Sequence, residues 1–379
     1  MLRIMAAVLC LAAPRPGPAP GAAGDDAVKN GDFKQGGSSW DIPAPNEEQE
    51  CAVVDLDGAK AVRLRRKKEG AQAGIVQFNL KLKPQTLYRL SVTGRGDAPG
   101  HVSLCPQSSK DPEFLKLYKA WAVSSAPLAP SPGPATESLV FDSGLGPDSA
   151  FLKLGLDGTA PGSYFVSAVA LTELGPSLPA PDELVIAHIG DSITITSYLP
   201  FSQRVDSQLD LRIRKAFPAL KTRQVNLGAD GEWASELFET RRYEKAIRGQ
   251  NQRIDIAIVR YGGNDSRKYS AKEFKRHLGV LCDALQKDYP AVQIVLGDGP
   301  FMFKSDDVNR QYAAYWQAER DLAAERKYPL ADVYKRFEKA ASVAVYRAEN
   351  DMHPGVQGVA LCADALFAAL EPLLKARSK

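Results

Sequence analysis

The pattern of hydrophobic and polar positions divides the chain into two halves with different periods. In the first half, short segments alternate apolar with polar or small residues, and Gly, Pro and Asp separate them. An alternation of period two is typical of strands with one buried face. The alternating segments are residues 61–65, 75–82, 87–92, 151–156 and 164–171. Because no long helical pattern lies among them, the first half is predicted to be a β-sandwich of the jelly-roll kind.

The second half instead alternates short apolar runs with segments of helical spacing. Strands are expected at residues 184–189, 222–227, 255–261, 292–297 and 329–333, and helices near 203–217, 232–249, 271–288, 307–326 and 355–375. This order predicts a parallel sheet, and right-handed crossovers place helices on both of its faces. The fold class expected here is therefore α/β, with three layers (α/β/α).

The domain boundaries follow from changes in composition. The Pro-rich segment 175–183 reads as a semi-rigid linker between a sandwich at 25–174 and an α/β domain at 184–379. A second Pro/Ser-rich stretch, 127–134, is predicted to be a loop inside the sandwich.

The N-terminus has the features of an export signal. A short positive region at Arg3, an apolar core at 4–13 and small residues at 21–24 predict a signal peptide over 1–24. The expected location is therefore secreted or periplasmic. The alternative is a Pro/Ala-rich leader without structure.

Composition narrows the classes of partner. The 379 residues are 44% hydrophobic and 25% charged, which is typical of a globular protein, and the formal net charge is +3. A nearly balanced charge does not favour nucleic acid as a partner, and no apolar run approaches the ~20 residues of a membrane span. The oligomeric state stays open.

The cysteines allow, but do not establish, disulfides. Export would remove Cys10 and leave Cys51 and Cys105 in the first half and Cys282 and Cys362 in the second. An oxidising compartment permits one bridge in each half. The apolar helical surroundings of Cys282 and Cys362 instead favour buried thiols.

A serine stands where the first strand of the second half ends. The motif GDSIT at 190–194 directly follows the strand expected at 184–189, so Ser192 is predicted at the carboxyl edge of the sheet, where open α/β sheets bind ligands. Thr194 excludes the Gly-x-Ser-x-Gly elbow. On its own, Ser192 could equally cap the following helix.

Three further motifs follow in order: NLGADG at 226–231, GGND at 262–265 and DMHP at 351–354. The first two come after predicted strands and so share an edge of the sheet with Ser192. With GDSIT, they resemble in order and spacing the SGNH (GDSL) hydrolases, a family of serine esterases. The resemblance covers residues 184 to 375, about half of the chain.

The resemblance implies a nucleophile and a base. A serine hydroxyl needs an adjacent base to attack a carbonyl, and the family's motifs make Ser192 the nucleophile and His353 that base. Among the other histidines, His188 lies inside a predicted strand, His277 lies in mid-helix and His101 lies in the other half.

The same resemblance implies donors for an oxyanion. They are the N–H of Ser192, the N–H of Gly231 and the side-chain amide of Asn264, with Gly228 as an alternative to Gly231. Taken alone, these residues would read as a turn glycine and a helix-capping asparagine.

The chain departs from the family pattern beside the histidine. The family has Asp three residues before the His, whereas this chain has Asn350 there and Asp351 two residues before. Three possibilities remain: Asp351 reaches His353 through a shifted turn, Asn350 accepts through its carbonyl oxygen, or Ser192 and His353 work as a dyad with a backbone acceptor.

No cofactor or metal is expected. The sequence has neither a His/Cys/Asp cluster with ligand spacing nor a Gly-rich phosphate loop.

The first half is similar to carbohydrate-binding jelly-roll modules in its opening NGDF at 30–33 with Trp40. Trp40 and Trp121 are candidate platforms for a sugar ring. Lys34 and Ser167 stand where calcium-binding modules have acidic residues, which argues against such a site. The basic run 63–68 is interpreted as a solvated strand edge rather than as a contact for an anionic polysaccharide.

The sequence therefore predicts a secreted serine esterase that removes O-acetyl groups from a polysaccharide. Alternatives are a lipase or thioesterase, whose acyl channel the apolar segment 195–201 would supply in part, and an O-acyltransferase. A glycan-binding protein with a decayed site is a fourth hypothesis, supported only by Asn350. Trp233 and Trp316 are candidates for a wall of the cleft.

Overall fold

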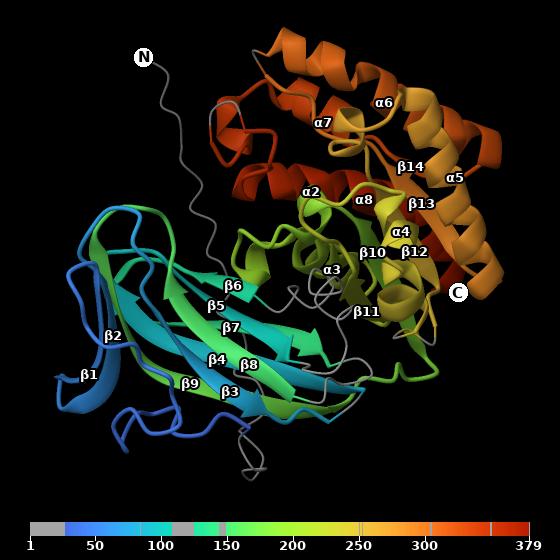
Figure 1. The fold of residues 1–379 in the computed structure, drawn as a ribbon. Coiled ribbons are helices and arrows are strands. Elements are labelled where there is room, and N and C mark those ends of the chain that lie inside the picture. The colour runs from blue at the N-terminus through green and yellow to red at the C-terminus, as the bar shows by residue number, and fades with distance from the viewer. Residues whose placement is uncertain are drawn as a thin grey trace, which may run out of the picture.

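The computed structural model contains two domains that lie side by side, one built from strands and one from strands and helices in alternation (Figure 1). It describes residues 27–83, 85–107, 125–143, 149–249, 251, 253–303, 305–348 and 351–378. The predicted signal peptide, Trp121 and Asn350 lie outside these residues.

The N-terminal domain is a two-sheet β-sandwich. Its strands are β1 (Gln49–Leu56), β2 (Ala59–Arg66), β3 (Gly74–Leu80), β4 (Thr86–Gly96), β5 (Gly100–Gln107), β6 (Ser125–Leu128), β7 (Ser131–Asp142), β8 (Ser149–Leu156) and β9 (Gly162–Pro176). One sheet has the order β1-β2-β9-β4-β7 and the other β3-β8-β5-β6, and neighbouring strands are antiparallel. Leu64 and Leu90 of the first sheet share one core with Ile75 and Leu152 of the second. The alternation in the sequence follows from this single buried face of each sheet.

The Pro/Ser-rich stretch 127–134 is not one loop, as the sequence predicts, but the end of β6, a short connection at 129–130 and the start of β7. Both strands lie at sheet edges. Proline lacks the N–H of a ladder bond, and an edge strand can spare that donor because one of its sides has no partner strand. The prediction is wrong because composition alone cannot tell an edge strand from a loop.

The basic run 63–68 is also not an edge, because β2 pairs with β1 on one side and with β9 on the other. The run is divided between two faces. Arg66 is 3% exposed and donates to the backbone oxygens of Ala71 and Leu156, whereas Arg63 and Arg65 project from the opposite face.

Trp40 belongs to the core and is not a sugar platform. It is 7% exposed, its ring centroid lies 5.4 Å from that of Phe33, and its Nε1 donates to the backbone oxygen of Asn30 at 3.2 Å. A ring enclosed in this way cannot stack on a sugar.

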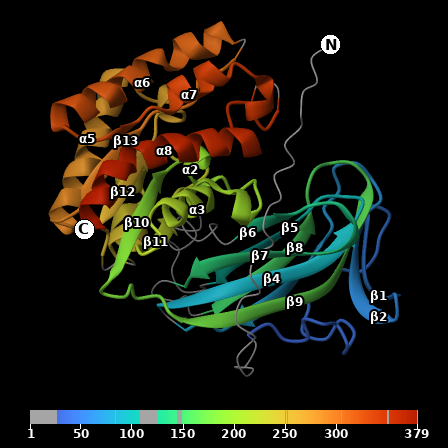
Figure 2. The same cartoon turned by 180° about the vertical axis from the view of Figure 1, so that it is seen from behind.

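The C-terminal domain has the predicted α/β/α layers. Its parallel sheet has the order β11-β10-β12-β13-β14, with β10 (Glu183–Gly190), β11 (Lys221–Asn226), β12 (Ile256–Arg260), β13 (Gln293–Gly297) and β14 (Leu330–Ala331). Helices α3 (Val205–Ala216), α7 (Val333–Ala340) and α8 (Val356–Arg377) cover one face, and α5 (Ala271–Asp288) and α6 (Asp306–Arg326) cover the other (Figures 1 and 2). The short elements are α2 (Ser192–Ile195), η1 (Phe201–Gln203), α4 (Glu236–Glu239), the π-helix η2 (Tyr243–Arg248), η3 (Asp265–Arg267) and η4 (Val343–Val345).

The helix predicted over 232–249 is interrupted. α4 and η2 are separated at Arg241, whose φ is +58°. The next residue, Arg242, forms a buried ion pair with Glu232, from Nη1 to Oε2 at 2.8 Å. This tertiary contact outweighs the local helix propensity, which is the only signal that the sequence offers here.

The two domains touch near the segment that follows Ser192. β7 of the sandwich contacts η1. The neighbouring Arg204 is 3% exposed, and burial lowers the pKa of its guanidinium, while the carboxylates of Asp206 and of Glu137 on β7 oppose that effect. The sandwich therefore abuts the segment that leads away from the candidate nucleophile.

Where the structure describes a cysteine side chain, it is a buried free thiol: Cys51, Cys282 and Cys362. Cys282 on α5 and Cys362 on α8 lie on opposite faces of the parallel sheet, so the bridge permitted in the second half does not form. Among the described residues, no helix is both long and apolar enough to cross a membrane.

Replacing the buried indole tests the placement of Trp40. Trp40→Ala should destabilise the sandwich by about 3 kcal/mol, the usual cost of a cavity left by a large aromatic side chain. Scanning calorimetry should show a lower transition temperature for this domain only, since two domains need not unfold together. Trp40→Phe, which keeps an aromatic ring, should lower the stability of the sandwich by less than Trp40→Ala does. An unchanged transition in Trp40→Ala would contradict the core placement.

Candidate active site

Ser192 stands at the carboxyl end of β10, the first strand of the parallel sheet along the chain. β10 ends at Gly190, and Ser192 is the first residue of α2. A side chain at Gly190 would come within 2.2 Å of both the Arg260 carbonyl oxygen and Thr194 Oγ1, so the tight turn requires glycine. The cap of α2 is Asp191, whose carboxylate accepts the Ile193 N–H at 3.1 Å. The hydroxyl of Ser192 is therefore not used as a cap.

A chain of two hydrogen bonds joins Ser192, His353 and Asp351. Ser192 Oγ lies 2.9 Å from His353 Nε2, and His353 Nδ1 lies 2.5 Å from Asp351 Oδ1. The same carboxylate oxygen also accepts the backbone N–H of His353 at 3.0 Å. Of the three possibilities that the sequence leaves open, this geometry corresponds to Asp351 reaching His353 through a shifted turn.

The second oxygen of Asp351 is held by a residue that none of the sequence motifs contains. Arg347 contacts Asp351 Oδ2 through Nε at 2.7 Å and through Nη2 at 2.6 Å. Burial raises the pKa of the Asp351 carboxyl, but hydrogen bonds from His353 and Arg347 more than offset this, so the pKa lies below its ordinary value. Asp351 is thus kept ionised beside the imidazole.

Tyr198 fixes the imidazole from another side. Its ring meets that of His353 edge-on, with 5.4 Å between centroids, and its hydroxyl donates to the Pro354 carbonyl at 3.0 Å. The Arg347 guanidinium lies 5.0 Å from the same ring. The sequence offers one signal for the cluster of Tyr198, Arg347, Asp351 and His353, namely the spacing of four residues between Arg347 and Asp351.

The predicted oxyanion residues lie in adjoining turns. Gly231 has φ +72°, a conformation that favours glycine. Asn264 Nδ2 donates to the backbone carbonyl of Glu232, the residue after Gly231, at 3.1 Å. Asn264 precedes η3 but makes no side-chain cap bond. Gly228 has a packing role instead, because a Cβ there would lie 2.8 Å from the Ile195 N on α2.

The GGND loop reaches both halves of the serine–histidine pair. A Cβ at Gly263 would lie 3.6 Å from Asp191 Oδ2, next to Ser192, and 3.5 Å from the methyl carbon of Met352, next to His353. The four motifs therefore converge at one edge of the sheet. His188 bonds Gln224 inside the domain, at 2.8 Å from its Nε2, and does not take part.

Two buried carboxyl groups beneath this edge have raised pKa values. Burial raises the pKa of Asp191 to about 7, although the Ile193 N–H and Arg260 oppose the rise. Burial likewise raises the pKa of Asp265 to about 6, against hydrogen bonds from the N–H groups of Ala234 and Gly262. Both groups change protonation close to neutral pH.

The two tryptophans proposed for the cleft wall have different surroundings. Trp316 is 1% exposed and packs under Gly262 and Gly299, so it is a core residue and that proposal is wrong. Trp233 is half-buried, two residues after Gly231, with the Lys268 ammonium 4.0 Å from its ring centroid. Among the described residues, no group of three or more His, Cys, Asp or Glu could hold a metal ion.

Fold and site together define an α/β/α domain with a serine, a histidine and an aspartate at the carboxyl edge of its sheet. Residues 188–361 match the model of the GDSL-like Lipase/Acylhydrolase family. The C-terminal domain is therefore a GDSL-like (SGNH) hydrolase domain, as the motifs predict.

Solved structures similar to this chain include three proteins of low sequence identity. Axe2, an acetylxylan esterase from Geobacillus stearothermophilus, shares 20% identity over 51% of this chain and 95% of its own, with a TM-score of 0.43. LAE5, an alpha/beta hydrolase from the metagenome of Lake Arreo, shares 21% over 52% and 98%, with a TM-score of 0.43. A Bacillus subtilis protein shares 16% over 92% of this chain and 93% of its own, with a TM-score of 0.47. A search among curated proteins found no match.

The raised pKa of Asp191 predicts a stability that depends on pH. Because the folded pKa of about 7 exceeds the ordinary 3.8, the folded protein holds a proton between these values that the unfolded chain has released. The contribution of this group is therefore fully present below pH 3.8 and declines as the pH rises through 7. Asp191→Asn has no charge to bury and should gain about 1–3 kcal/mol at pH 8. Denaturant unfolding should show a smaller gain at pH 5, and equal gains at both pH values would contradict the assignment.

The contacts of Asp351 predict a graded series of variants. Asp351→Asn should lower kcat for ester hydrolysis by about 10³-fold or more, since an amide cannot stabilise the imidazolium. Arg347→Met acts only through Asp351 and should lower kcat by about tenfold with little change in KM. Arg347→Lys, which keeps the charge, should recover part of the loss. Wild-type kcat in Asp351→Asn would instead indicate a Ser–His dyad.

Proposed function

We propose that the protein is a secreted serine esterase that removes O-acetyl or similar short acyl groups from a polysaccharide. The observation that carries the esterase part is the hydrogen-bonded chain from Ser192 Oγ through His353 to Asp351, at 2.9 and 2.5 Å. It places a base against the hydroxyl and a carboxylate against the base, which is what a serine nucleophile needs.

In the proposed reaction, Ser192 Oγ attacks the ester carbonyl while His353 Nε2 takes the hydroxyl proton. The imidazolium that forms is stabilised by Asp351 at Nδ1. As the tetrahedral intermediate collapses, His353 gives the proton to the leaving sugar oxygen, and the acyl group stays on Ser192. Water, deprotonated by His353 in turn, then releases the acid and restores the hydroxyl.

In this proposal, three hydrogen-bond donors stabilise the negatively charged oxygen of each tetrahedral intermediate: the N–H groups of Ser192 and Gly231 and the side-chain amide of Asn264. An amide nitrogen carries two protons, and the contact with the Glu232 carbonyl uses one of them. The other is available for the oxyanion. The left-handed backbone of Gly231 supports this role, since that conformation turns an N–H in a way that other residues rarely allow.

A short acyl group fits the segment after Ser192 better than a long one. Ile195 and Leu199 are 2% and 9% exposed, so their side chains are buried in the domain and do not line an open surface. The lipase or thioesterase hypothesis needs such residues to line an open channel. The preference for a short chain is what separates an acetylesterase from those alternatives.

The polymeric substrate and the location are supported by the rest of the chain. The sandwich contacts η1, which begins nine residues after Ser192, and this contact supports an accessory role for the sandwich. The signal peptide expected over 1–24 supports a secreted or periplasmic enzyme. An O-acyltransferase would use the same residues with a sugar hydroxyl in place of water.

The test compares p-nitrophenyl acetate with longer acyl esters and measures acetate release from acetylated xylan and pectin. Wild type should prefer acetate, and Ser192→Ala should lose about 10³-fold or more in kcat. Ser202→Ala, an exposed serine ten residues on, is the matched control and should keep full activity. A preference for long chains would favour a lipase or thioesterase. Absence of Ser192-dependent turnover on every ester would overturn the hydrolase proposal.

A further inference from the structure

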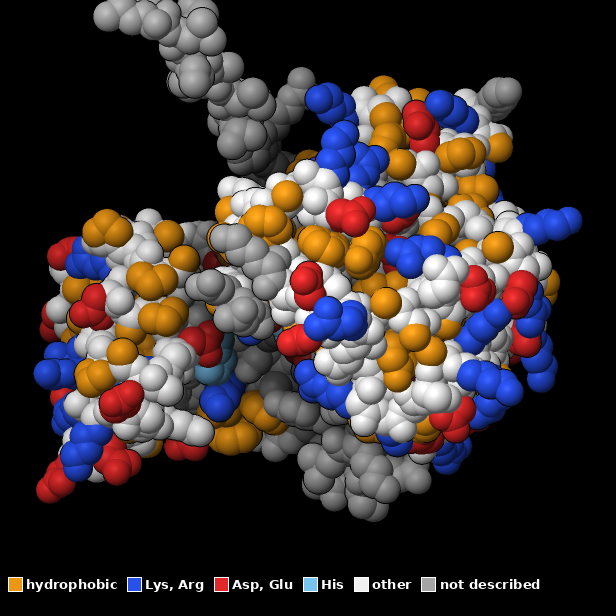
Figure 3. Space-filling view, turned by 90° about the horizontal axis from the view of Figure 1, so that it is seen from above, with side chains coloured by type: hydrophobic (Ala, Val, Ile, Leu, Met, Phe, Trp, Pro, Cys, Tyr) orange, Lys and Arg blue, Asp and Glu red, His pale blue; other side chains and the backbone are white. Residues whose placement is uncertain are grey.

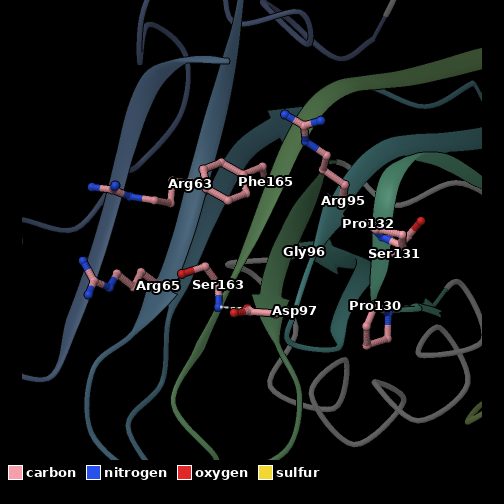
Figure 4. Close-up of a pocket in the computed structure, with 10 residues that line it drawn as sticks. All are labelled: Arg63, Arg65, Arg95, Gly96, Asp97, Pro130, Ser131, Pro132, Ser163 and Phe165. Carbon is pink, nitrogen blue, oxygen red and sulfur yellow. Dashed lines mark hydrogen bonds between the residues drawn. The ribbon is translucent and has the colours of Figure 1, made fainter. Parts of the chain in front are cut away.

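The outward face of the five-stranded sheet in the sandwich carries a hollow of about 730 Å³. It is lined by charged, aromatic and small residues from β2, β4, β7 and β9 and from the turns next to β4 and β7: Arg63, Arg65, Arg95, Gly96, Asp97, Pro130, Ser131, Pro132, Ser163 and Phe165. Figure 4 shows Phe165 in the middle, with Arg63 and Arg65 on one side and Arg95 and the start of β7 on the other. The hollow lies outside the candidate active site and shares no residue with it.

The hollow owes its shape to a bulge in β7. Gly94 pairs with Ala135 and Gly96 with Ser131, so residues 132–134 of β7 lie opposite the single residue Arg95 of β4. Pro132 and Pro134 cannot donate ladder bonds, which favours a bulge at this place. At Gly96 a Cβ would lie 2.3 Å from the Ser163 carbonyl oxygen, so β4 and β9 approach closely under the hollow. The bulge in β7 therefore forms one wall of the hollow, and Gly96, which has no side chain, forms part of its floor.

The rim of the hollow has an excess of cations. Arg63, Arg65 and Lys67 share the single carboxylate of Glu50, and the Arg65 contact, at 3.8 Å, is too long for a hydrogen bond. Arg65 is half-exposed. The guanidinium groups therefore retain donors that Glu50 does not satisfy, and the Nε of Arg63 is buried without a partner.

Arg95 stands across the hollow with a weak partner. Its Nη2 lies 2.6 Å from Asp57, whose side chain is 71% exposed. An ion pair with so exposed a carboxylate contributes little to stability, and a guanidinium has five donors. A ligand carboxylate can therefore bind Arg95 without a large loss elsewhere. The face of the molecule in Figure 3, by contrast, has Lys and Arg interspersed with Asp and Glu over both domains.

The floor suits a sugar ring. Phe165 is half-buried on the outward face, because its neighbours Tyr164 and Val166 point into the core. An aromatic ring held this way covers the apolar face of a pyranose. Beyond it, hydroxyl pairs join β4 to β7, Ser91 with Ser138 at 2.7 Å and Thr93 with Thr136 at 2.8 Å. These pairs continue the polar face along β7, the strand that contacts the C-terminal domain.

We propose that this hollow binds an acidic polysaccharide, with a sugar ring over Phe165 and uronate carboxylates on Arg95 and on the Arg63–Arg65 side. Guanidinium groups bind carboxylates in a planar, bidentate way, which neutral sugars cannot exploit. The basic run around residue 63 is then a ligand contact and not a solvated edge. The inference deepens the proposed function and rests on it: the acylated substrate would be a polysaccharide that carries uronic acids.

The test measures binding of the full chain to polygalacturonate, which carries no acyl ester, and to the same backbone with its carboxylates methyl-esterified. Affinity electrophoresis or calorimetry should show binding to the acidic polymer only, weakening as salt is raised. The double variant Arg65→Ala with Arg95→Ala should bind at least about tenfold more weakly, since each removes a charge-assisted contact. All variants should hydrolyse p-nitrophenyl acetate as wild type does.

Lys60→Ala is the matched control. Lys60 is an exposed cation on β2, the strand that carries Arg65. It is paired with Asp55 at 2.9 Å and does not line the hollow. It should bind polygalacturonate as wild type does. Equal binding of both polymers, equal loss in Lys60→Ala, or no binding of the acidic polymer would each overturn the proposal. None of these outcomes bears on Ser192-dependent turnover, so a failure here is distinct from a failure of the esterase proposal.

Discussion

The candidate site depends on one buried carboxylate that ties two loops together. Asp265 is fully buried and accepts the N–H of Ala234 at 3.0 Å and the N–H of Gly262 at 3.2 Å. Ala234 lies in the loop after β11 and Gly262 in the loop after β12, so these bonds hold Gly231 and Asn264 in adjoining turns. A buried charge is costly unless it is hydrogen-bonded, and the two backbone N–H groups offset part of that cost here. The placement of the proposed oxyanion donors therefore comes from the interior of the domain and not from the loops themselves.

What the sequence predicts well is what local chemistry determines. α5 is predicted over 271–288 and found as Ala271–Asp288, because Ser270 and Glu273 form a capping box at its start. The glycines and polar residues that end β10 and β12 are likewise readable, because a strand followed by a tight turn needs them. The four motifs converge for a topological reason, since parallel strands end at one edge.

What the sequence does not reveal depends on contacts between distant segments. Nothing near Trp40 tells that its ring faces Phe33, and nothing in residues 127–134 tells that the prolines lie on edge strands. The basic run around residue 63 reads as one patch, yet the pleat sends Arg66 inward and its neighbours outward. Arg347 is a fourth case: it meets Asp351 because Tyr346 pairs with Pro354 and brings the chain back on itself.

That return of the chain has a consequence for how such enzymes diversify. Arg347, Asp351 and His353 lie on one small loop closed by the Tyr346–Pro354 bridge, and the Arg347 N–H donates to the His353 carbonyl at 2.8 Å. The acid and the base thus belong to one closed segment of the chain. With a spacing of two residues, Asp351 and His353 still meet inside this loop, at 2.5 Å from Oδ1 to Nδ1. Homologue searches that insist on a fixed spacing would pass over enzymes of this design, whereas a search for the closed loop would recover them.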